Sequence, residues 1–327
     1  MARLVPGERT RASGCFQSFD EFPPNAEFES RVEVGEMAAL ALQTVRGYVA
    51  LTKPRILLLV IFTALPVMAM AAEGWPGTAF ACATLLGIGL AAGAANALNC
   101  YIERDLDALM ERTRSRPLPA KQLAPNAALV FGIVLSVCAT AVLYAFSGPL
   151  AASLGVASIL FYVFVYTVWL KPRTSLNAVV GGAAGAAAPL IADAAVHGHV
   201  GAAGWLLFAI IFLWQPPHVW AIALFRKSDY ARAGIPMLPN TIGDEATRWR
   251  MLWYTLGLVP VTLAPVPLGL LGAVYLALAL ALDAWFVWNA VRVLRERSES
   301  AARRLFHVSL AYLAALFLAM LLDRALL

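Results

Sequence analysis

Residues 84–107 read Thr-Leu-Leu-Gly-Ile-Gly-Leu-Ala-Ala-Gly-Ala-Ala-Asn-Ala-Leu-Asn-Cys-Tyr-Ile-Glu-Arg-Asp-Leu-Asp, an apolar run that ends in amide and acidic side chains. So many small residues in an apolar run predict a helix that packs closely against other helices in a membrane. At about 100° per residue, Asn99, Glu103 and Asp107 fall on one stripe of that helix, over roughly 12 Å of its axis. The stretch therefore predicts a membrane helix whose three oxygen-bearing side chains face one way where the helix meets water.

The composition of the whole chain is typical of a membrane protein. Of its 327 residues, 61% are hydrophobic and 14% are charged, which excludes an ordinary soluble domain. Crossing about 30 Å of hydrocarbon takes roughly 20 apolar residues in a helix, and runs near that length recur along the chain. We therefore predict an all-α polytopic membrane protein, a nine-transmembrane-helix bundle. The predicted spans are 54–72, 78–101, 123–146, 149–170, 175–195, 202–224, 251–268, 270–291 and 304–322.

The basic residues predict how these spans are oriented. The segments between the nine spans, and the two chain ends, lie alternately on the two sides of the membrane. With this assignment, 24 of the 25 lysines and arginines fall on the same side as the N-terminus, and only Arg324 falls on the opposite side. Because short cytoplasmic loops retain Lys and Arg, we expect a cytoplasmic N-terminus and an external C-terminus. The net charge of +5 then reflects topology and contact with anionic membrane lipid, and nucleic acid is not an expected partner. An even number of spans would scramble the separation of charge, so the charges independently favour nine.

The N-terminal segment differs in kind from the rest. Residues 1–40 mix Arg, Glu, Pro and Ser without a long apolar run, so we predict a disordered cytoplasmic tail followed by a membrane domain over residues 41–327. An apolar signal segment and a clear organellar presequence are both lacking. This favours the cytoplasmic (inner) membrane of a bacterium over a mitochondrial membrane.

Two polar loops, predicted to cap the bundle on the cytoplasmic side, carry most of the remaining chemistry. They occupy residues 102–122 and 225–250, and each mixes acids with bases before a proline-bounded turn. Carboxylate and amide oxygens suit Mg²⁺ that arrives on a diphosphate, and guanidinium groups suit phosphate oxygens. Two less specific interpretations stay open at this point. The acidic stripe would be an ordinary solvated helix end, and the arginines of the first loop would be signals for membrane orientation.

His218 stands inside a predicted span, directly after Pro216 and Pro217. The paired prolines remove two backbone donors and are expected to open the helix, which at membrane depth is typical of a cavity wall. Two roles stay open for His218 from the residues alone: a base or a group that positions water, and a structural hydrogen bond between helices.

Several separated motifs together resemble the UbiA-type intramembrane prenyltransferases. Asn99-x₃-Glu103-x₃-Asp107 is similar to the first acidic motif of that family, and the surrounding motifs narrow the resemblance to the branch that farnesylates protoheme IX. The resemblance covers about residues 45–320. The motifs are Glu103-Arg-Asp-Leu-Asp107 with Arg112-Thr-Arg-Ser-Arg-Pro-Leu-Pro119, Tyr166-Thr167 with Lys171-Pro-Arg-Thr-Ser-Leu-Asn177, Gln215-Pro-Pro-His218, and Asp229-Tyr-Ala-Arg-Ala-Gly-Ile-Pro-Met-Leu-Pro239.

This resemblance implies a reaction and a set of site residues. Farnesyl diphosphate would give its farnesyl group to the vinyl group of protoheme IX, with addition of water, and Mg²⁺ would be the cofactor. A downstream heme-modifying membrane enzyme is an expected associate. The implied metal ligands are Asn99, Glu103, Asp107 and Asp229; the implied substrate-binding residues are Arg112, Arg114, Arg116, Tyr166, Lys171, Asn177 and Lys227; and His218 joins Asn99, Glu103 and Asp107 as catalytic. With heme as the implied acceptor, a third role stays open for His218, that of an axial ligand to the heme iron.

The chain departs from the family pattern at both acidic motifs. Cys100 follows Asn99 where many relatives have Asp, and Glu103 replaces a middle Asp, while Asp229 is the only acid between residues 220 and 234. A second Mg²⁺ would need Asp105 or Glu111, unless one metal suffices. Two other functions stay open: prenyl transfer to an aromatic quinone precursor, and transport, in which broken helices are also common.

Overall fold

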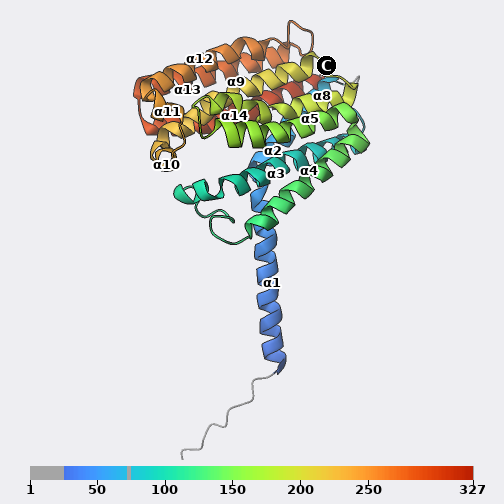
Figure 1. The fold of residues 1–327 in the computed structure, drawn as a ribbon. Helices are drawn as coiled ribbons and strands as arrows, with labels where there is room; N and C mark the ends of the chain where they lie inside the picture. The colour runs from blue at the N-terminus through green and yellow to red at the C-terminus, as the bar shows by residue number, and fades with distance from the viewer. Residues whose placement is uncertain (1–25, 72–74, 327) are drawn as a thin grey trace, which may run out of the picture. The chain divides into compact units, whose positions relative to one another are not determined.

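The structure is a computed structural model that describes residues 26–71 and 75–326, and these residues form helices and turns without a strand (Figure 1). This confirms the predicted all-α class. The helices are α1 (Ala26–Leu51), α2 (Pro54–Ala71), α3 (Thr78–Leu109), α4 (Pro125–Ser147), α5 (Pro149–Leu160), the π-helix η1 (Phe161–Leu170), α6 (Asn177–Val180), α7 (Gly182–Gly185), α8 (Ala187–His197), α9 (Ala202–Phe225), α10 (Lys227–Arg232), α11 (Leu238–Thr241), α12 (Asp244–Leu263), α13 (Ala273–Glu296) and α14 (Glu299–Leu326).

The chain divides into two units, Met1–Gln43 and Thr44–Leu327. The predicted disordered tail, residues 1–40, falls in the first unit. Its residues 1–25 lie outside the described residues, whereas residues 26–40 are helical as part of α1. The domain boundary at residue 40 stays a prediction. The functional site described below lies in the second unit.

Helices of the second unit pack mainly against their neighbours in sequence, as short connections favour. The order α2, α3, α4, α5, α8, α9, α12, α13, α14 runs round the bundle, and α14 returns to pack on α2. Glycines allow the close approaches: a Cβ added at Gly87 or Gly155 would lie 2.6 or 2.7 Å from the Leu143 side chain. Helices α10 and α11 and the C-terminal end of α3 lie at one end of the bundle, on the left in Figure 1.

Seven helices in the described residues are long and apolar enough to cross a membrane. A bent pair, Ala39–Leu51 with Pro54–Met70 at 47°, would make eight. The predicted count of nine is not confirmed, because α12 is not among these helices. Its first two turns carry Asp244, Glu245, Arg248 and Arg250, and turns follow Leu263, so the apolar part covers only about 20 Å at about 1.5 Å per residue.

Two of the predicted spans have an unexpected backbone. The span predicted at 175–195 forms three consecutive helices, α6, α7 and α8, which are interrupted at Gly181 and Ala186. The opposite holds for α9, because it stays one helix through Pro216 and Pro217, where we expected a break. The two prolines remove backbone donors from α9 without ending the helix.

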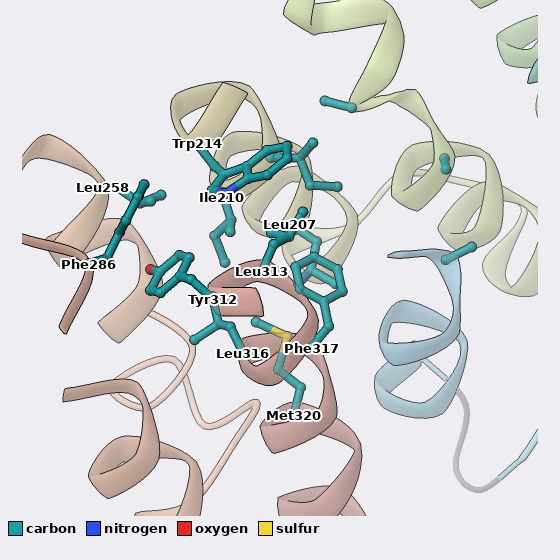
Figure 2. Close-up of a cluster of buried hydrophobic side chains, with 14 of the residues drawn as sticks. Leu207, Ile210, Trp214, Leu258, Phe286, Tyr312, Leu313, Leu316, Phe317 and Met320 are labelled. Carbon is teal, nitrogen blue, oxygen red and sulfur yellow. The ribbon is translucent and has the colours of Figure 1, made fainter. Parts of the chain in front are cut away.

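The largest buried hydrophobic cluster takes side chains from helices α2 to α14, and Figure 2 shows the part of it that α9, α12, α13 and α14 form. The Phe286 and Tyr312 rings stack with centroids 4.6 Å apart, and the Trp214 indole nitrogen donates to the Ser309 carbonyl at 2.8 Å. These contacts fix α14 against α9 and α13.

Buried acids inside the bundle have partners, as the cost of charge in a membrane requires. Asp283 accepts hydrogen bonds from the Tyr312 hydroxyl at 2.6 Å and the Thr262 hydroxyl at 2.7 Å. Asp193 pairs with His197 at 3.0 Å and accepts the backbone N–H groups of two glycines at the start of α9, at 2.7 and 3.1 Å. These acids therefore tie helix ends and helix pairs together.

Candidate active site

The acidic stripe on α3 faces the protein interior. Asn99, Glu103 and Asp107 are only 2%, 4% and 1% exposed. A solvated helix end would leave such side chains in water, so this alternative is wrong. Buried ionised carboxylates need opposite charge and hydrogen bonds, and each position of the stripe has a basic partner.

Asn99 is held from two sides. The Lys53 ammonium donates to the Asn99 amide oxygen at 2.9 Å, and the Asn99 amide nitrogen donates to the Thr167 hydroxyl at 3.1 Å. Lys53 comes from the turn between α1 and α2, and Thr167 comes from η1. The amide oxygen is thereby fixed in direction beside a cation.

The two acids of the stripe form buried ion pairs. Lys171 donates to Glu103 Oε2 at 2.6 Å, and its nitrogen lies 2.5 Å from Oε1. Arg116 donates to Asp107 Oδ2 at 2.6 Å. The Lys171 and Arg116 side chains are 16% and 27% exposed, so these charges interact with little screening by water.

The π-helix η1 brings its side chains onto the stripe. The Thr167 hydroxyl donates to the Tyr162 carbonyl at 2.8 Å, and the Lys171 N–H donates to the Tyr166 carbonyl at 2.9 Å, both across five residues. π-Helical turns are rare and frequent at functional sites. The Lys171 nitrogen also lies 5.9 Å from the centre of the Tyr166 ring. A regular α-helix would turn these side chains in other directions.

The two lysines that contact the stripe, Lys53 and Lys171, differ in how strongly they hold their proton. Burial lowers the pKa of Lys53 below its ordinary value, and this is the largest influence on it. Burial also lowers the pKa of Lys171, but Tyr166 and the ion pair with Glu103 act in the opposite direction, so its pKa lies above the ordinary value. Lys171 therefore stays an ammonium at neutral pH.

The second polar loop meets the end of α3 through an apolar cluster. Asp229 on α10 is only 3% exposed, pairs with Arg232, and lies 3.9 Å from Arg226. The next residue, Tyr230, packs in the same cluster as Met110, which follows α3. The cluster consists of Met110, Ala223, Tyr230, Ala233, Ile235 and Met237.

Two buried carboxylate oxygens in the two polar loops are of the ligand type that Mg²⁺ prefers. Glu103 Oε1 and Asp229 Oδ2 are buried and have no hydrogen-bond partner in the described chain, although Glu103 Oε1 is within ion-pair distance of Lys171. Mg²⁺ prefers such oxygens and needs few of them when it carries a phosphate group. Among the described residues, no three His, Cys, Asp or Glu side chains gather closely enough to hold a metal alone. The donor set therefore fits a metal that brings further oxygens with it.

An apolar cavity of about 200 Å³ lies beside the stripe. Asn96, one turn before Asn99, lines it together with Tyr162 and Gln215, and small or aliphatic residues of α2, α3, α5, α7 and α8 form the rest. Gly182 and Gly185 make room for Gln215, because a Cβ at either glycine would lie 3.2 or 3.1 Å from its amide oxygen. An apolar chain would fit this cavity with its polar end at the stripe.

The structure does not bring every predicted residue to the stripe. Asn177 is buried near Lys171 and donates to the Thr174 carbonyl at 2.8 Å. Arg112 and Arg114 are exposed. Lys227 pairs with Asp244 at 2.8 Å on the outer side of α10 and does not contact the stripe. Asp229 lies with its own arginines on α10, as described above.

His218 lies between α9 and α14. Its Nδ1 is 2.7 Å from the Ser309 hydroxyl, which donates its own hydrogen to the Phe306 carbonyl at 2.7 Å. The serine oxygen is then the acceptor, so we assign the His218 proton to Nδ1 and a free lone pair to Nε2. The Trp214 and Phe306 rings stack against the imidazole at 4.6 and 4.8 Å.

Sequence reasoning missed Lys53 and Thr167 as members of the site. A signal for Lys53 was present: Lys-Pro-Arg occurs twice, at 53–55 and 171–173. Both lysines of this repeated tripeptide contact the stripe. Thr167 had no comparable signal, because its position depends on the π-helical turn of η1.

Comparison with known proteins defines the class. Residues 60–321 match the UbiA prenyltransferase family, and the chain belongs to this family. Two relatives, from Gloeobacter violaceus and Symbiobacterium thermophilum, are both named protoheme IX farnesyltransferase. They are 49% and 47% identical over 279 and 283 residues, which cover 84% and 86% of this chain and 91% and 95% of theirs.

Solved structures share the fold at low sequence identity. A digeranylgeranylglyceryl phosphate synthase has a TM-score of 0.73 at 16% identity, over 87% of this chain and 99% of that one. A UbiA homolog from Archaeoglobus fulgidus, bound to GPP and Mg²⁺, has a TM-score of 0.59 at 13% identity, over 84% of this chain and 99% of that one.

Proposed function

We propose that this protein transfers the farnesyl group of farnesyl diphosphate to a vinyl group of protoheme IX, with addition of water, to give heme O and diphosphate. The names of the relatives support this acceptor and donor. The observation that carries the proposal is the buried α3 stripe, in which Asn99, Glu103 and Asp107 each face a cation beside an apolar cavity. Such an arrangement suits a diphosphate head group with an apolar tail.

We propose that Asn99, Glu103 and Asp107 bind Mg²⁺ from the stripe and that Asp229 binds the metal-diphosphate complex from α10, with the diphosphate supplying the remaining oxygens because no three acids gather in the described residues. When bound there, Mg²⁺ would neutralise the charge that develops on the leaving diphosphate. The solved family member with GPP and Mg²⁺ supports this assignment, as do the two buried carboxylate oxygens without a hydrogen-bond partner in the described chain.

The basic residues that contact the stripe would bind the diphosphate oxygens directly. Lys53, Lys171 and Arg116 already converge on the stripe, and charge-assisted hydrogen bonds from fixed donors stabilise developing negative charge. The C–O bond to the diphosphate breaks, the vinyl carbon of the acceptor bonds to the farnesyl carbon, and water adds to the resulting cation and loses a proton. Burial of the stripe keeps bulk water from the allylic cation.

The other predicted residues would act around this centre. Tyr166 and Asn177 contact or adjoin Lys171, and in our proposal they orient its ammonium. Arg112 and Arg114 are exposed on the first loop, where they would attract the diphosphate before it reaches Arg116. We do not assign Lys227 to the diphosphate, since it pairs with Asp244.

We propose that His218 serves the porphyrin acceptor through its free Nε2. His218→Ala is expected to lower transfer by about 10²-fold, the usual contribution of a positioned acid or base. If Nε2 ligates the iron, the visible spectrum of bound protoheme IX will shift in the variant. Lost activity with an unchanged spectrum would instead assign His218 to positioning the water. Activity and spectrum both equal to wild type would contradict either role.

The decisive test is an assay of membranes that contain the protein. With protoheme IX, farnesyl diphosphate and Mg²⁺, we expect a heavier and more hydrophobic heme, detected by chromatography and mass spectrometry. Removal of Mg²⁺ with a chelator should abolish the product, and added Mg²⁺ should restore it. Turnover of 4-hydroxybenzoate without a heme product would instead establish a quinone-precursor acceptor.

We also propose that the chain lies in a bacterial cytoplasmic membrane with its polar loops and N-terminus in the cytoplasm. The separation of Lys and Arg to one set of loops supports this orientation. Association with a downstream heme-modifying membrane enzyme stays a prediction.

A further inference from the structure

Besides the apolar cavity, the chain has a polar pocket of about 660 Å³ next to α10. It is bounded by the second loop, the start of α12 and the turn between α13 and α14, and none of the α3 stripe residues lines it. Helix α10 separates the two regions: Lys227, Ser228 and Ala231 line the pocket, whereas Tyr230 packs against Met110 at the end of α3. The charged residues of the pocket are Lys227, Asp244, Arg248, Arg297 and Glu299.

Arg248 is the most buried cation of this pocket, and it has a buried donor without a partner. Its side chain is only 13% exposed, and its Nε is buried without a hydrogen-bond partner in the described chain. One terminal nitrogen donates to the Arg297 carbonyl at 3.3 Å and lies 4.0 Å from Asp244. The two other cations are already paired, Lys227 with Asp244 at 2.8 Å and Arg297 with Glu245 at 3.2 Å. A buried guanidinium with free donors calls for an acceptor, and a carboxylate matches its planar geometry.

The pocket also has an apolar wall that leads towards His218. Leu224 and Phe225 line it. The Phe225 ring lies 6.1 Å from the Phe306 ring, which stacks on His218 at 4.8 Å. An occupant with both a carboxylate and a flat apolar body would therefore contact Arg248 and this aromatic group together.

We propose that this pocket binds a propionate carboxylate of the porphyrin acceptor, with Arg248 as the main donor. The inference rests on the proposed function and adds a subsite to it. Protoheme IX carries its propionates and its vinyl groups on opposite edges of the ring. Anchoring the propionate edge in this pocket directs the opposite, vinyl edge along Phe225 and Phe306 towards His218. Arg248 thereby selects a porphyrin acid and sets the orientation of the ring.

The test compares protoheme IX with its dimethyl ester, in which both propionates are uncharged. Arg248→Gln is expected to raise KM for protoheme IX about tenfold, equivalent to about 1.4 kcal/mol, and to leave KM for the dimethyl ester and for farnesyl diphosphate unchanged. Arg248→Lys, which keeps the charge, should fall between. The matched control is Arg292→Gln, because Arg292 pairs with Glu296 on α13 and does not line the pocket. It should behave as wild type.

A binding titration separates failure of this inference from failure of the proposed function. Soret absorbance of protoheme IX is followed on full-length protein in nanodiscs, without farnesyl diphosphate, so it needs no turnover. Tighter binding of the acid than of the ester in wild type, lost in Arg248→Gln, supports the subsite even if no farnesyl transfer occurs. Equal loss for acid and ester, or no loss, overturns it. If Arg248→Gln loses protoheme IX binding only in nanodiscs of anionic phospholipid, and not in nanodiscs of phosphatidylcholine, the inference is overturned in favour of a lipid headgroup site.

Discussion

Glu103→Gln is expected to lower kcat/KM for farnesyl transfer by about 10²–10³-fold, the usual cost of removing one group that stabilises charge in the transition state. Glutamine keeps the size of the side chain but removes the negative charge that pairs with Lys171. It also replaces one of the two carboxylate oxygens, the atoms proposed to bind Mg²⁺, with an amide nitrogen. Asp107→Asn should act alike, because Asp107 pairs with Arg116 in the same stripe. The rate is measured in membranes, with the amount of inserted protein determined by immunoblot.

The matched control stands two residues away on the same helix. Asp105 has an 86% exposed side chain and lies 3.7 Å from Arg104, so Asp105→Asn removes one charge from the same motif without touching the buried stripe. Its transfer rate should stay within about twofold of wild type, since exposed pairs contribute roughly 0–1 kcal/mol. Near-normal turnover in both Glu103→Gln and Asp107→Asn would remove the stripe from the proposed mechanism. A large loss in Asp105→Asn would give the exposed acid the metal role instead.

Lys171→Met is expected to destabilise the folded protein by about 3–5 kcal/mol, because it leaves the Glu103 carboxylate buried without its cation. The double variant Lys171→Met/Glu103→Gln should recover much of this loss, since both charges are then absent from the interior. The free energy of unfolding is measured in detergent by thermal or denaturant-induced unfolding. Both variants should be inactive, so stability and catalysis are read separately.

Lys227→Met is the matched control for stability. Lys227 also pairs with an aspartate at hydrogen-bond distance, but the Lys227 and Asp244 side chains are 45% and 39% exposed. Water screens this pair, and its loss should cost at most about 1 kcal/mol. If the double variant is as unstable as the sum of its two single variants, the charges of Lys171 and Glu103 do not act as a pair.

Periodicity and composition predicted the stripe before any coordinates. Helical spacing alone places Asn99, Glu103 and Asp107 on one face, and the structure shows that this face is buried. The same reasoning was not confirmed at α12, because the helix ends at Leu263 and its apolar part is shorter than the predicted span 251–268. It was wrong at α9, because Pro216 with Pro217 did not end a helix that neighbouring helices hold in place.

The partners of the stripe lay beyond sequence reasoning. Lys53 is separated from Asn99 by 46 residues and Lys171 from Glu103 by 68, and no local pattern fixes contacts over such distances. Thr167 reaches Asn99 only because η1 is wound as a π-helix. Lys227 carried the same charge as these lysines, yet it turns to Asp244 on the other side of α10.

The sequence by itself determined the class of protein, most of the long apolar helices and the one face of α3 that carries oxygen-bearing side chains, because these depend on composition and on spacing within one helix. Only the tertiary structure decided which cations meet that face, where the apolar cavity lies, and that Arg248 has an unfilled donor in a separate pocket. The physical reason is that hydropathy and periodicity act along the chain, whereas the pairing of buried charges depends on which helices pack side by side.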